Sequence, residues 1–363
     1  MSGRRSLAPV RLQHLQVKSG RRPRRKVLIA PSSRNPYIDS LVTQLGARGF
    51  SVDVKDLPNL FVLRGFVGDA DVLHLHWLNR FFFAERSREA YARAWSFIAQ
   101  LDYARRMQAL YVVWTCHNLE SHENAHPELD RRLRRKMAKL SDAIIVHSES
   151  AKSRVVESLD ADPRRVTVMR HPHYQDAYPV SAPDEPPPGE GPVFLALGRV
   201  RPYKGLDRIV DASVNCRARH RLLIVGEVEK GFDDGKLVTA ASIHPHITYR
   251  PGALDADEIA RTIAMSDVML PPASDILTSG SLVLAMSLGK ACVVPRGSYA
   301  DGVMPVDGGA FYSLGDGSDL RRTLEKIAKR GSEFDAMGNI NRTEALRWNW
   351  SSFARDTAAV YQQ

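Results

Sequence analysis

The feature of this chain that most constrains its fold is a repeated alternation of short apolar runs with amphipathic segments. The apolar runs predict buried strands, at 26–31, 50–55, 71–77, 111–115, 143–146, 166–169, 193–197, 221–225, 247–249, 268–270 and 291–294. The segments between them predict helices, at 35–48, 80–107, 130–140, 206–214, 256–265, 281–288 and 350–361, and a further helix between the strands at 143–146 and 166–169. In the long helix over 80–107, Tyr91, Trp95, Ile98 and Leu101 share one predicted face. Strands that alternate with helices in this way predict an α/β fold with parallel sheets.

A change in composition divides the chain into two such units. Residues 178–192 hold six prolines and three acidic residues and almost no large apolar side chain, which predicts an interdomain linker. We therefore expect an N-terminal domain over 27–177, a second domain over 193–348 and a closing helix over 349–363. A length of 363 residues fits two domains of roughly 150 residues each. Ligands of such sheets bind at the carboxyl ends of the strands, which predicts a binding cleft between the domains.

The positive charge of the chain is concentrated at its start. Residues 1–26 contain nine of the 51 lysines and arginines and no acidic residue, so they account for nearly all of the net charge of +10. Such a basic, disordered tail suits an anionic membrane surface or a nucleic acid, and it is equally compatible with a solvated extension. No apolar run approaches the roughly 20 residues of a membrane span, and no apolar segment of a secretory signal follows the first arginines. Three scattered cysteines favour a reduced, cytoplasmic chain.

Two loops after predicted strands carry residue types that bind anions. In the first, Gly198 lets the backbone turn, and Arg199 and Lys204 can both face one diphosphate. A surface basic loop would have the same composition. In the second, residues 278–281 (Thr-Ser-Gly-Ser) open a helix with free N–H groups and hydroxyls, which either bind an anion or only cap the helix. Both loops lie at strand ends of one predicted sheet, so one phosphate site could use both.

The order of these motifs resembles a known family. The second half carries Gly198-Arg-x4-Lys204-Gly205, Gly226-Glu227, Tyr249-Arg-Pro-Gly252, Gly280-x4-Ala285-Met286 and a closing Trp350 helix. This order is similar to the donor half of GT-B glycosyltransferases of the family-4 type. The first half, with Asn35-Pro-Tyr37, His74-Leu-His-Trp77, Trp114-Thr-x-His117-Asn118 and Ser141-Asp-x-Ile-Ile-Val-His147-Ser148, resembles the acceptor half of bacterial polysaccharide glycosyltransferases.

This resemblance implies two facing Rossmann-like domains and transfer of a hexose from a nucleotide-sugar to a glycan or lipid-linked saccharide. The nucleotide-sugar is a substrate, and neither a cofactor nor a metal is expected. Arg199 and Lys204 would stabilise the leaving diphosphate, and His117 would contact the donor sugar or the reacting hydroxyl. The implied donor-binding residues also include Gly198, Gly226, Glu227, Arg250, Thr278, Ser279, Gly280 and Ser281. The implied acceptor-binding residues are Asn35, His74, His76, Asn118, His122 and Glu123, and Glu120, His122 or Glu123 could serve as a base.

The chain departs from the family pattern at two positions. The family has two glutamates eight residues apart, one for the donor sugar and one for the ribose, and this chain has Ile276 and Leu284 there. Asp275 or the hydroxyls of Thr278 and Ser279 could replace the sugar contacts. Inverting β-mannosyltransferases of xanthan-like polymers share a comparable pattern, so the stereochemical outcome stays open. Three Asp-Ala-Asp tripeptides, beginning at residues 69, 160 and 255, lie where turns and helix starts favour aspartate, so we do not assign them to a metal.

Two other activities remain open at this stage. A sugar-nucleotide epimerase can share the GT-B architecture, and the basic tail could serve a nucleic-acid-binding protein, although the body carries almost no net charge. Phe81-Phe-Phe83 and the basic residues between Arg131 and Lys139, together with the tail, are typical of a peripheral enzyme at the inner membrane surface.

Overall fold

The computed structural model describes residues 25–33, 35–57, 65–121, 126–178, 182–271, 276–297 and 299–363. Most of the predicted tail, His122, Glu123 and Asp275 therefore lie outside the described residues. No helix in the described part of the chain has both the length and the apolar character needed to cross a membrane.

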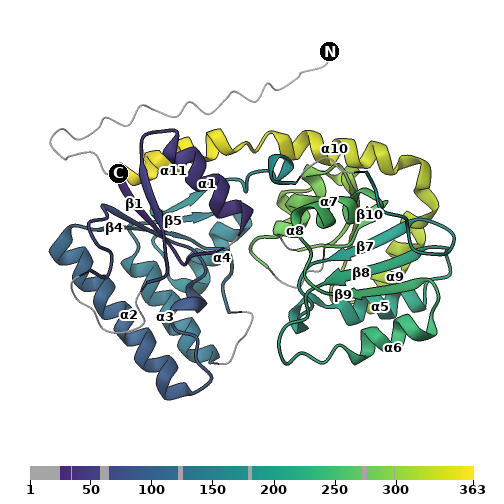
Figure 1. Ribbon diagram of the computed structural model, residues 1–363, viewed down its shortest axis with the longest axis horizontal. Coiled ribbons are helices and arrows are strands. Elements are labelled where there is room, and N and C mark those ends of the chain that lie inside the picture. Colours follow the sequence, from purple (N-terminus) through teal and green to yellow (C-terminus); the bar gives the residue numbers. More distant parts are fainter. Residues whose placement is uncertain are drawn as a thin grey trace, which may run out of the picture.

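Two six-stranded parallel sheets lie side by side, each covered by helices on both faces (Figure 1). The first has the order β2-β1-β3-β4-β5-β6 and the second the order β12-β11-β10-β7-β8-β9. The predicted α/β fold with two Rossmann-like halves is confirmed. The parallel arrangement follows from the continuous burial of strands such as β1, β3 and β5, because strands buried on both faces cannot alternate with polar residues.

The first sheet and its helices come from the N-terminal half. Its strands are β1 (Lys26–Ala30), β2 (Ser51–Val54), β3 (Val72–Leu75), β4 (Tyr111–Thr115), β5 (Ala143–Val146) and β6 (Val166–Val168). The helices are α1 (Pro36–Gly46), the 3₁₀ helix η1 (Leu78–Phe81), α2 (Ser87–Gln108), α3 (Pro127–Leu140) and α4 (Glu149–Leu159). Asn35 caps α1 by accepting a hydrogen bond from the Tyr37 N–H, and a proline occupies the first helical position, as the sequence predicts.

The second sheet is built in the same way from the C-terminal half. Its strands are β7 (Val193–Leu197), β8 (Arg221–Gly226), β9 (Ile247–Pro251), β10 (Val268–Met269), β11 (Ala291–Pro295) and β12 (Gly309–Tyr312). Its helices are α5 (Leu206–Val214), α6 (Gly235–Ile243), α7 (Ala256–Ala264), α8 (Gly280–Ser287), α9 (Gly317–Ile327) and α10 (Phe334–Leu346). The described residues 182–192 between the two halves form neither helix nor strand.

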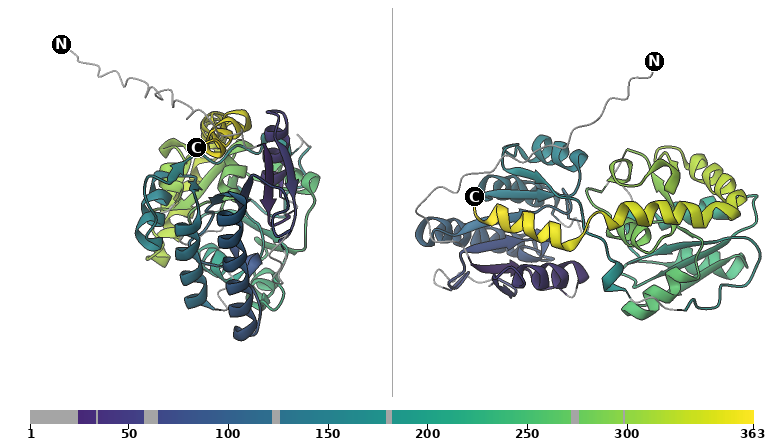
Figure 2. Two further views of the ribbon diagram at one scale, coloured as in Figure 1. Left: turned by 90° about the vertical axis from the view of Figure 1, so that its left-hand side faces the viewer. Right: turned by 90° about the horizontal axis from the view of Figure 1, so that it is seen from above.

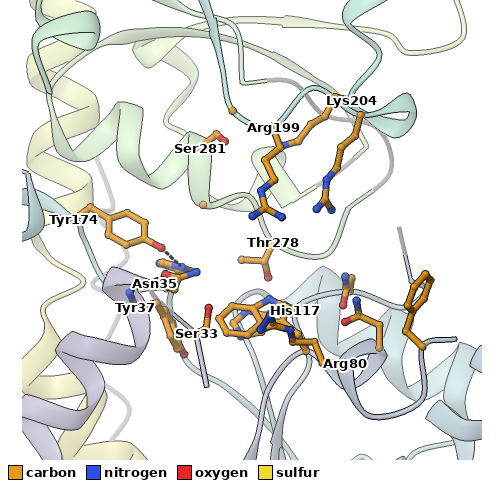
Figure 3. A pocket seen from close by; sticks show the side chains of 18 of the residues that line it. Ser33, Asn35, Tyr37, Arg80, His117, Tyr174, Arg199, Lys204, Thr278 and Ser281 are labelled. Atoms are coloured by element: carbon orange, nitrogen blue, oxygen red, sulfur yellow. Dashed lines mark hydrogen bonds between the residues drawn. The ribbon is translucent and has the colours of Figure 1, made fainter. Parts of the chain in front are cut away.

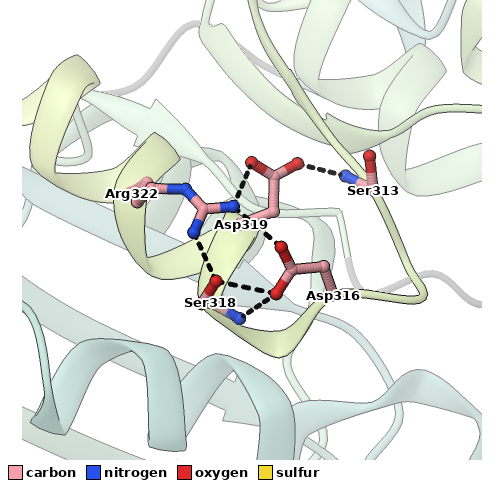
Figure 4. A network of polar contacts seen from close by, with 5 residues as sticks. All are labelled: Ser313, Asp316, Ser318, Asp319 and Arg322. Atoms are coloured by element: carbon pink, nitrogen blue, oxygen red, sulfur yellow. Dashed lines mark hydrogen bonds and ion pairs between the residues drawn. The ribbon is translucent and has the colours of Figure 1, made fainter.

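Local polar contacts set where the helices of the second half begin. At the start of α9 the carboxylate of Asp316 accepts hydrogen bonds from the N–H and hydroxyl of Ser318 and pairs with Arg322 at 2.8 Å (Figure 4). These contacts lower the pKa of Asp316 to about 2, with the Ser318 hydroxyl as the largest cause. Asp319 accepts from the Ser313 N–H, which ties the helix to the segment after β12. Aspartate is favoured here because it satisfies N–H groups that the first turn leaves unpaired.

The last helix crosses back to the first half. Seen from above, α10 lies against the second half and α11 (Trp350–Tyr361) continues over the first (Figure 2). The buried side chains of α11 belong to the same apolar cluster as α1 and β1. The Tyr361 hydroxyl lies 2.7 Å from His74 Nδ1, and the Trp350 indole donates to the His173 carbonyl. The chain passes between the halves twice, near residues 173 and 348, and the His173 N–H donates to the Trp348 carbonyl where these two segments meet.

Helix α2 differs from the prediction in both extent and orientation. The structure replaces one helix over 80–107 by the short η1, an irregular segment and α2. Ile98 and Leu101 are buried, as expected, but Tyr91 is 38% exposed and Trp95 is 70% exposed. The helix packs on the sheet through Ala90, Ala94, Phe97, Ile98 and Leu101 instead. Ala90 and Ala94 in this stripe allow close contact with the sheet, and Tyr91 and Trp95 lie outside the stripe.

Candidate active site between the two sheets

A cavity of about 720 Å³ lies between the two halves, at the carboxyl ends of their strands (Figure 3). Its lining residues follow β1, β3, β4 and β6 of the first sheet and β7 and β10 of the second. They are Ser33, Asn35, Tyr37, Trp77, Asn79, Arg80, Phe83, Arg93, His117, Asn118, His171, Tyr174, Gly198, Arg199, Arg201, Lys204, Thr278, Gly280 and Ser281. The sheets position these loops opposite one another because parallel strands end at a common edge.

The upper wall in Figure 3 carries the cationic side chains of Arg199 and Lys204, and Gly198 also lines this cavity. Gly198 adopts a φ of +137°, and a Cβ placed on it would lie 3.8 Å from Ser281 Oγ and 3.9 Å from Lys204 Nζ. The absence of a side chain therefore leaves space between an ammonium group and a hydroxyl. Arg199 and Lys204 both point from this wall toward His117. Burial, and then the charge of Arg201, lowers the pKa of Lys204 to about 8.

The helix α8 adds a second set of donors to this wall. Ser279 caps α8 by accepting from the Leu282 N–H, so it serves the helix and does not line the cavity. The structure thus shows the capping alternative at Ser279, while its predicted donor contact stays a prediction. Thr278, Gly280 and Ser281 do line the cavity, as predicted. Thr278 Oγ1 is buried and makes no hydrogen bond within the described part of the chain, which leaves it available to a ligand.

A second cavity of about 340 Å³ adjoins the first along Arg199, Gly198 and Ser281. Its walls are largely apolar and include Leu197, Leu254, Ile259, Met269 and Leu284. Glu227 and Gly226 line this second cavity, and the Glu227 carboxylate pairs with Arg199 at 3.2 Å. Leu284 thus lies inside the candidate donor site, in the position where the sequence departs from the resembled family. Arg250 is exposed on β9 and lines neither cavity, so the structure does not bring it together with the other predicted donor residues.

On the opposite wall His117 is placed by two neighbouring aromatic rings. It stacks on Trp77, with 5.0 Å between ring centroids, and its Nε2 lies 3.1 Å from His76 Nδ1. Burial and the neighbouring His147 hold the pKa of His117 well below its ordinary value. A neutral imidazole has one donor and one acceptor nitrogen, so His117 is suited to hydrogen bonding with a sugar hydroxyl at neutral pH.

The two strand histidines have structural roles instead of the predicted acceptor contacts. His74 is fully buried between Tyr361 and Thr115, whose hydroxyls each lie 2.7 Å from one of its ring nitrogens. His76 is 1% exposed and lies behind the cavity wall, against His117, Trp77 and Tyr37. The period of two correctly places them on one face of β3, but this face is covered by α11 and by the loop after β4. Neither residue lines the cavity.

Asn35 and Asn118 do line the cavity, and the structure adds residues that the sequence analysis missed. Arg80 and Arg93 reach the cavity from the first half, beside the exposed ring of Phe83. Tyr174 lies at the border of both cavities, with its hydroxyl 3.4 Å from His171 Nε2. Glu120 is exposed and lines neither cavity. No motif flagged Arg80 and Arg93, because their positions depend on how η1 and α2 pack.

The electrostatic character of the larger cavity is uniform. Five cationic side chains line it, Arg80, Arg93, Arg199, Arg201 and Lys204, and none of its described lining residues carries a carboxylate. The described residues contain no group of three or more histidine, cysteine, aspartate or glutamate side chains placed to hold a metal ion. The arrangement can bind an anion between the halves and present a neutral imidazole opposite it.

Three comparisons with known proteins agree with this architecture. Residues 191–330 match the family model described as Glycosyl transferases group 1. A GDP-mannose:glycolipid 4-beta-D-mannosyltransferase of Xanthomonas campestris pv. campestris is 26% identical over 290 residues, which cover 78% of each chain.

Solved structures extend the likeness to the whole fold. Sucrose-phosphate synthase from Thermosynechococcus elongatus superposes with a TM-score of 0.74 at 15% identity, over 94% of this chain and 98% of that one. HepE from Anabaena, solved in complex with UDP and glucose, has a TM-score of 0.69 at 14% identity, over 92% and 98% of the two chains. The fold, the sequence relative and the match of residues 191–330 to the group 1 model agree with one another, and the chain is a glycosyltransferase with a GT-B fold.

Proposed function

We propose that this enzyme transfers a hexose from a nucleotide-sugar to a lipid-linked saccharide, and that its donor is GDP-mannose. The observation that carries the proposal is the placement of Arg199 and Lys204 across the cavity from His117. Cleavage of the donor leaves additional negative charge on a nucleoside diphosphate, and fixed cations stabilise that charge where it develops. The identity of the donor is supported by the mannosyltransferase relative, which uses GDP-mannose by its name.

In this proposal each of the two cavities holds a different part of the donor. The diphosphate occupies the space next to Gly198, between Lys204 Nζ and Ser281 Oγ, and Thr278 Oγ1 supplies a further contact. The nucleoside occupies the apolar second cavity, where Leu284 packs against it. Glu227 is the acidic residue that lines this cavity. The sugar then projects into the larger cavity toward His117, which donates or accepts a hydrogen bond to one of its hydroxyls.

The acceptor side supports a saccharide that carries negative charge. Arg80 donates to the Ser32 carbonyl and has no carboxylate partner within the described residues. Arg93 pairs with Glu89 at 2.6 Å and also donates to the Phe83 carbonyl, so its guanidinium is held at the cavity edge. Arg80, which has no carboxylate partner among the described residues, favours an anionic group in the acceptor, such as a lipid-linked diphosphate or a sugar acid.

A thermal-shift panel of GDP, UDP, ADP and their sugars tests the donor. A ligand at 100 times its Kd stabilises a protein by about 2.7 kcal/mol, so the preferred nucleotide should raise the melting temperature clearly above the others. We expect the largest shift with GDP. An equal or larger shift with UDP would reject the proposed nucleotide, and no shift with any of them would reject the donor site.

Metal independence is a separate part of the proposal. We expect turnover to persist in excess EDTA, because Arg199, Lys204 and the start of α8 supply the positive potential at the diphosphate. The measurement is the rate of nucleotide-sugar consumption before and after chelation. Loss of activity that magnesium or manganese restores would contradict this expectation.

A further inference from the structure

Leu277, a residue of the second half, is buried in the apolar core of the first. It precedes helix α8 in the chain and is 2% exposed. Its apolar cluster is otherwise formed by buried residues of the first sheet and its helices, and no other described residue of the second half belongs to it. In contrast, Leu282 and Leu284, which follow on α8, pack in the core of their own half. The chain therefore crosses the gap between the halves at Leu277.

Polar contacts hold the same part of the chain to helix α4 of the first half. The Arg154 guanidinium, on α4, donates to the Ile276 carbonyl at 3.5 Å. The 3₁₀ helix η4 (Tyr299–Gly302) of the second half also contacts α4, and Arg170 donates to the Gly302 carbonyl. Residues 276 and 277 are thus fixed relative to the first half by one backbone contact and one buried side chain.

The next residue, Thr278, lines the larger cavity. In the view of Figure 3 it lies between Arg199 on one wall and His117 on the other. Its Oγ1 atom is buried and has no hydrogen-bond partner within the described residues. A buried hydroxyl without a partner costs free energy, and a ligand oxygen placed beside it removes that cost. Two consecutive residues therefore do different work, since Leu277 anchors the chain in the first half and Thr278 offers a donor to a ligand.

We propose that Leu277 is a positioning residue of the donor site, which holds the Thr278 hydroxyl where it donates to an oxygen of the bound diphosphate. This inference rests on the proposed function. Leu277 lines neither cavity, so it affects the nucleotide only through its neighbour. The Cα atoms of consecutive residues are about 3.8 Å apart, so a displacement of Leu277 moves Thr278 with it. Nucleotide affinity then depends on a leucine that packs in the opposite half.

A double-mutant cycle on the full chain tests this dependence. The dissociation constants of GDP and UDP are measured by calorimetric titration for the wild type, Leu277→Ala, Thr278→Val and the double variant. Loss of one hydrogen bond to a charged group weakens binding by roughly tenfold or more, and we expect this from Thr278→Val. Leu277→Ala should weaken binding by a similar factor. Because both changes remove the same contact, the double variant should bind no more weakly than Thr278→Val alone.

A matched control separates positioning from a general loss of stability. Leu159 belongs to the same apolar cluster and is also 2% exposed. It is the last residue of α4, which follows β5, so it lies at the edge of the sheet opposite the cavity. Leu159→Ala should therefore lower the melting temperature as Leu277→Ala does, but it should bind nucleotide as the wild type does. Leu277→Met, which retains the volume of the side chain, should restore wild-type affinity.

The outcomes that contradict the inference are distinct from failure of the proposed function. Unchanged nucleotide affinity in Leu277→Ala would show that this leucine only fills the core. Multiplied losses in the double variant would show that it does not act through Thr278. If Leu277→Ala does not fold, Leu277→Val gives the same comparison with a smaller change in volume. Absence of GDP and UDP binding by the wild type would reject the proposed donor site, and this inference with it.

Discussion

At the scale of single residues, the proposed transfer rests on the positions of Arg199 and Lys204. Both line the cavity, and Gly198 leaves open the space beside the Lys204 ammonium. Arg199 also pairs with Glu227 at 3.2 Å, so the carboxylate orients the guanidinium before a donor binds. Preorganised cations of this kind require little rearrangement when charge develops on the leaving group.

Removal of either cation should slow transfer sharply. We expect Arg199→Ala and Lys204→Ala each to lower kcat by roughly 10²–10³, the range observed for the loss of one charge-stabilising group. Arg347→Ala, which removes a 70% exposed arginine far along the chain, is the control and should leave turnover unchanged. Steady-state rates of nucleotide-sugar consumption check this. Near-normal rates in both cavity variants would show that the diphosphate binds elsewhere.

The lowered pKa of Lys204 predicts a pH dependence of nucleotide affinity. In the free enzyme this pKa is about 8, chiefly through burial, and a bound diphosphate would raise it again. Binding above pH 8 must therefore take up a proton, and the affinity for GDP should fall by up to about tenfold per pH unit there. Calorimetric titrations between pH 7 and 9.5 measure this. Lys204→Arg keeps its positive charge throughout this pH range. If its affinity for GDP fell with pH as steeply as that of the wild type, another group would be responsible.

At the scale of elements, a buried ion pair in α3 holds the loop that carries His117 and Asn118. Arg134 and Asp130 pair at 2.9 Å, with side chains only 1% and 4% exposed. Arg134 also donates to the Asn118 carbonyl, and Asp130 accepts from the Ser121 N–H. Backbone groups of the loop are therefore hydrogen-bonded to side chains of α3, where they would otherwise need water as a partner.

Breaking this pair should affect both stability and catalysis. Arg134→Ala leaves a buried carboxylate unpaired, which typically costs about 3–5 kcal/mol of unfolding free energy. The control is Arg132→Ala on the exposed side of α3, where solvent screens the pair with Glu128, so its loss should leave the unfolding free energy nearly unchanged. Urea unfolding measures both, and kcat of the folded Arg134 variant reports the displacement of His117. Equal effects of the two substitutions would contradict this role of the buried pair.

Helices and strands with a clear local sequence pattern were predictable, and those that depend on contacts with distant parts of the chain were not. The alternation of apolar runs predicts the strands up to β11, and Asn35-Pro36 predicts the start of α1. Helices α6, α9 and α10 and strand β12 were missed. β12 is a four-residue edge strand that is only partly buried, and its pairing with β11 supplies the contacts that its own pattern does not indicate.

At the scale of the whole molecule, α11 connects the halves through a cluster of buried histidines. The ring of Tyr37 lies 5.1–5.8 Å from the rings of His76, His117, His147 and His171, and from those of Trp350 and Phe353 on α11. Burial lowers the pKa of His74 and His171 to about 3 and that of His147 to about 4. The folded protein therefore keeps these rings neutral where an unfolded chain would protonate them.

Acid should consequently destabilise the protein. For a histidine whose folded pKa lies below its unfolded value of about 6.5, the stability is complete above pH 6.5 and is lost as pH falls toward the folded pKa. At pH 5 each of His74, His147 and His171 should lower the unfolding free energy by up to about 2 kcal/mol. Urea unfolding at pH 7.5, 6 and 5 measures the slope. His74→Gln should reduce the dependence of the unfolding free energy on pH by the contribution of one histidine. An unchanged dependence would show that other groups cause the acid sensitivity.

The sequence alone determined the α/β architecture, the two halves and the two loops of the second half that line the cavity, because strand periodicity and the residues at strand ends are local features of the chain. Only the tertiary structure decided the roles of His74 and His76, which share a strand face that α11 covers from the far end of the chain. It likewise placed Arg80 and Arg93 in the cavity and left Tyr91 and Trp95 outside. A helical period states which side chains lie together, but the packing of the helix on its sheet decides which of its faces is buried.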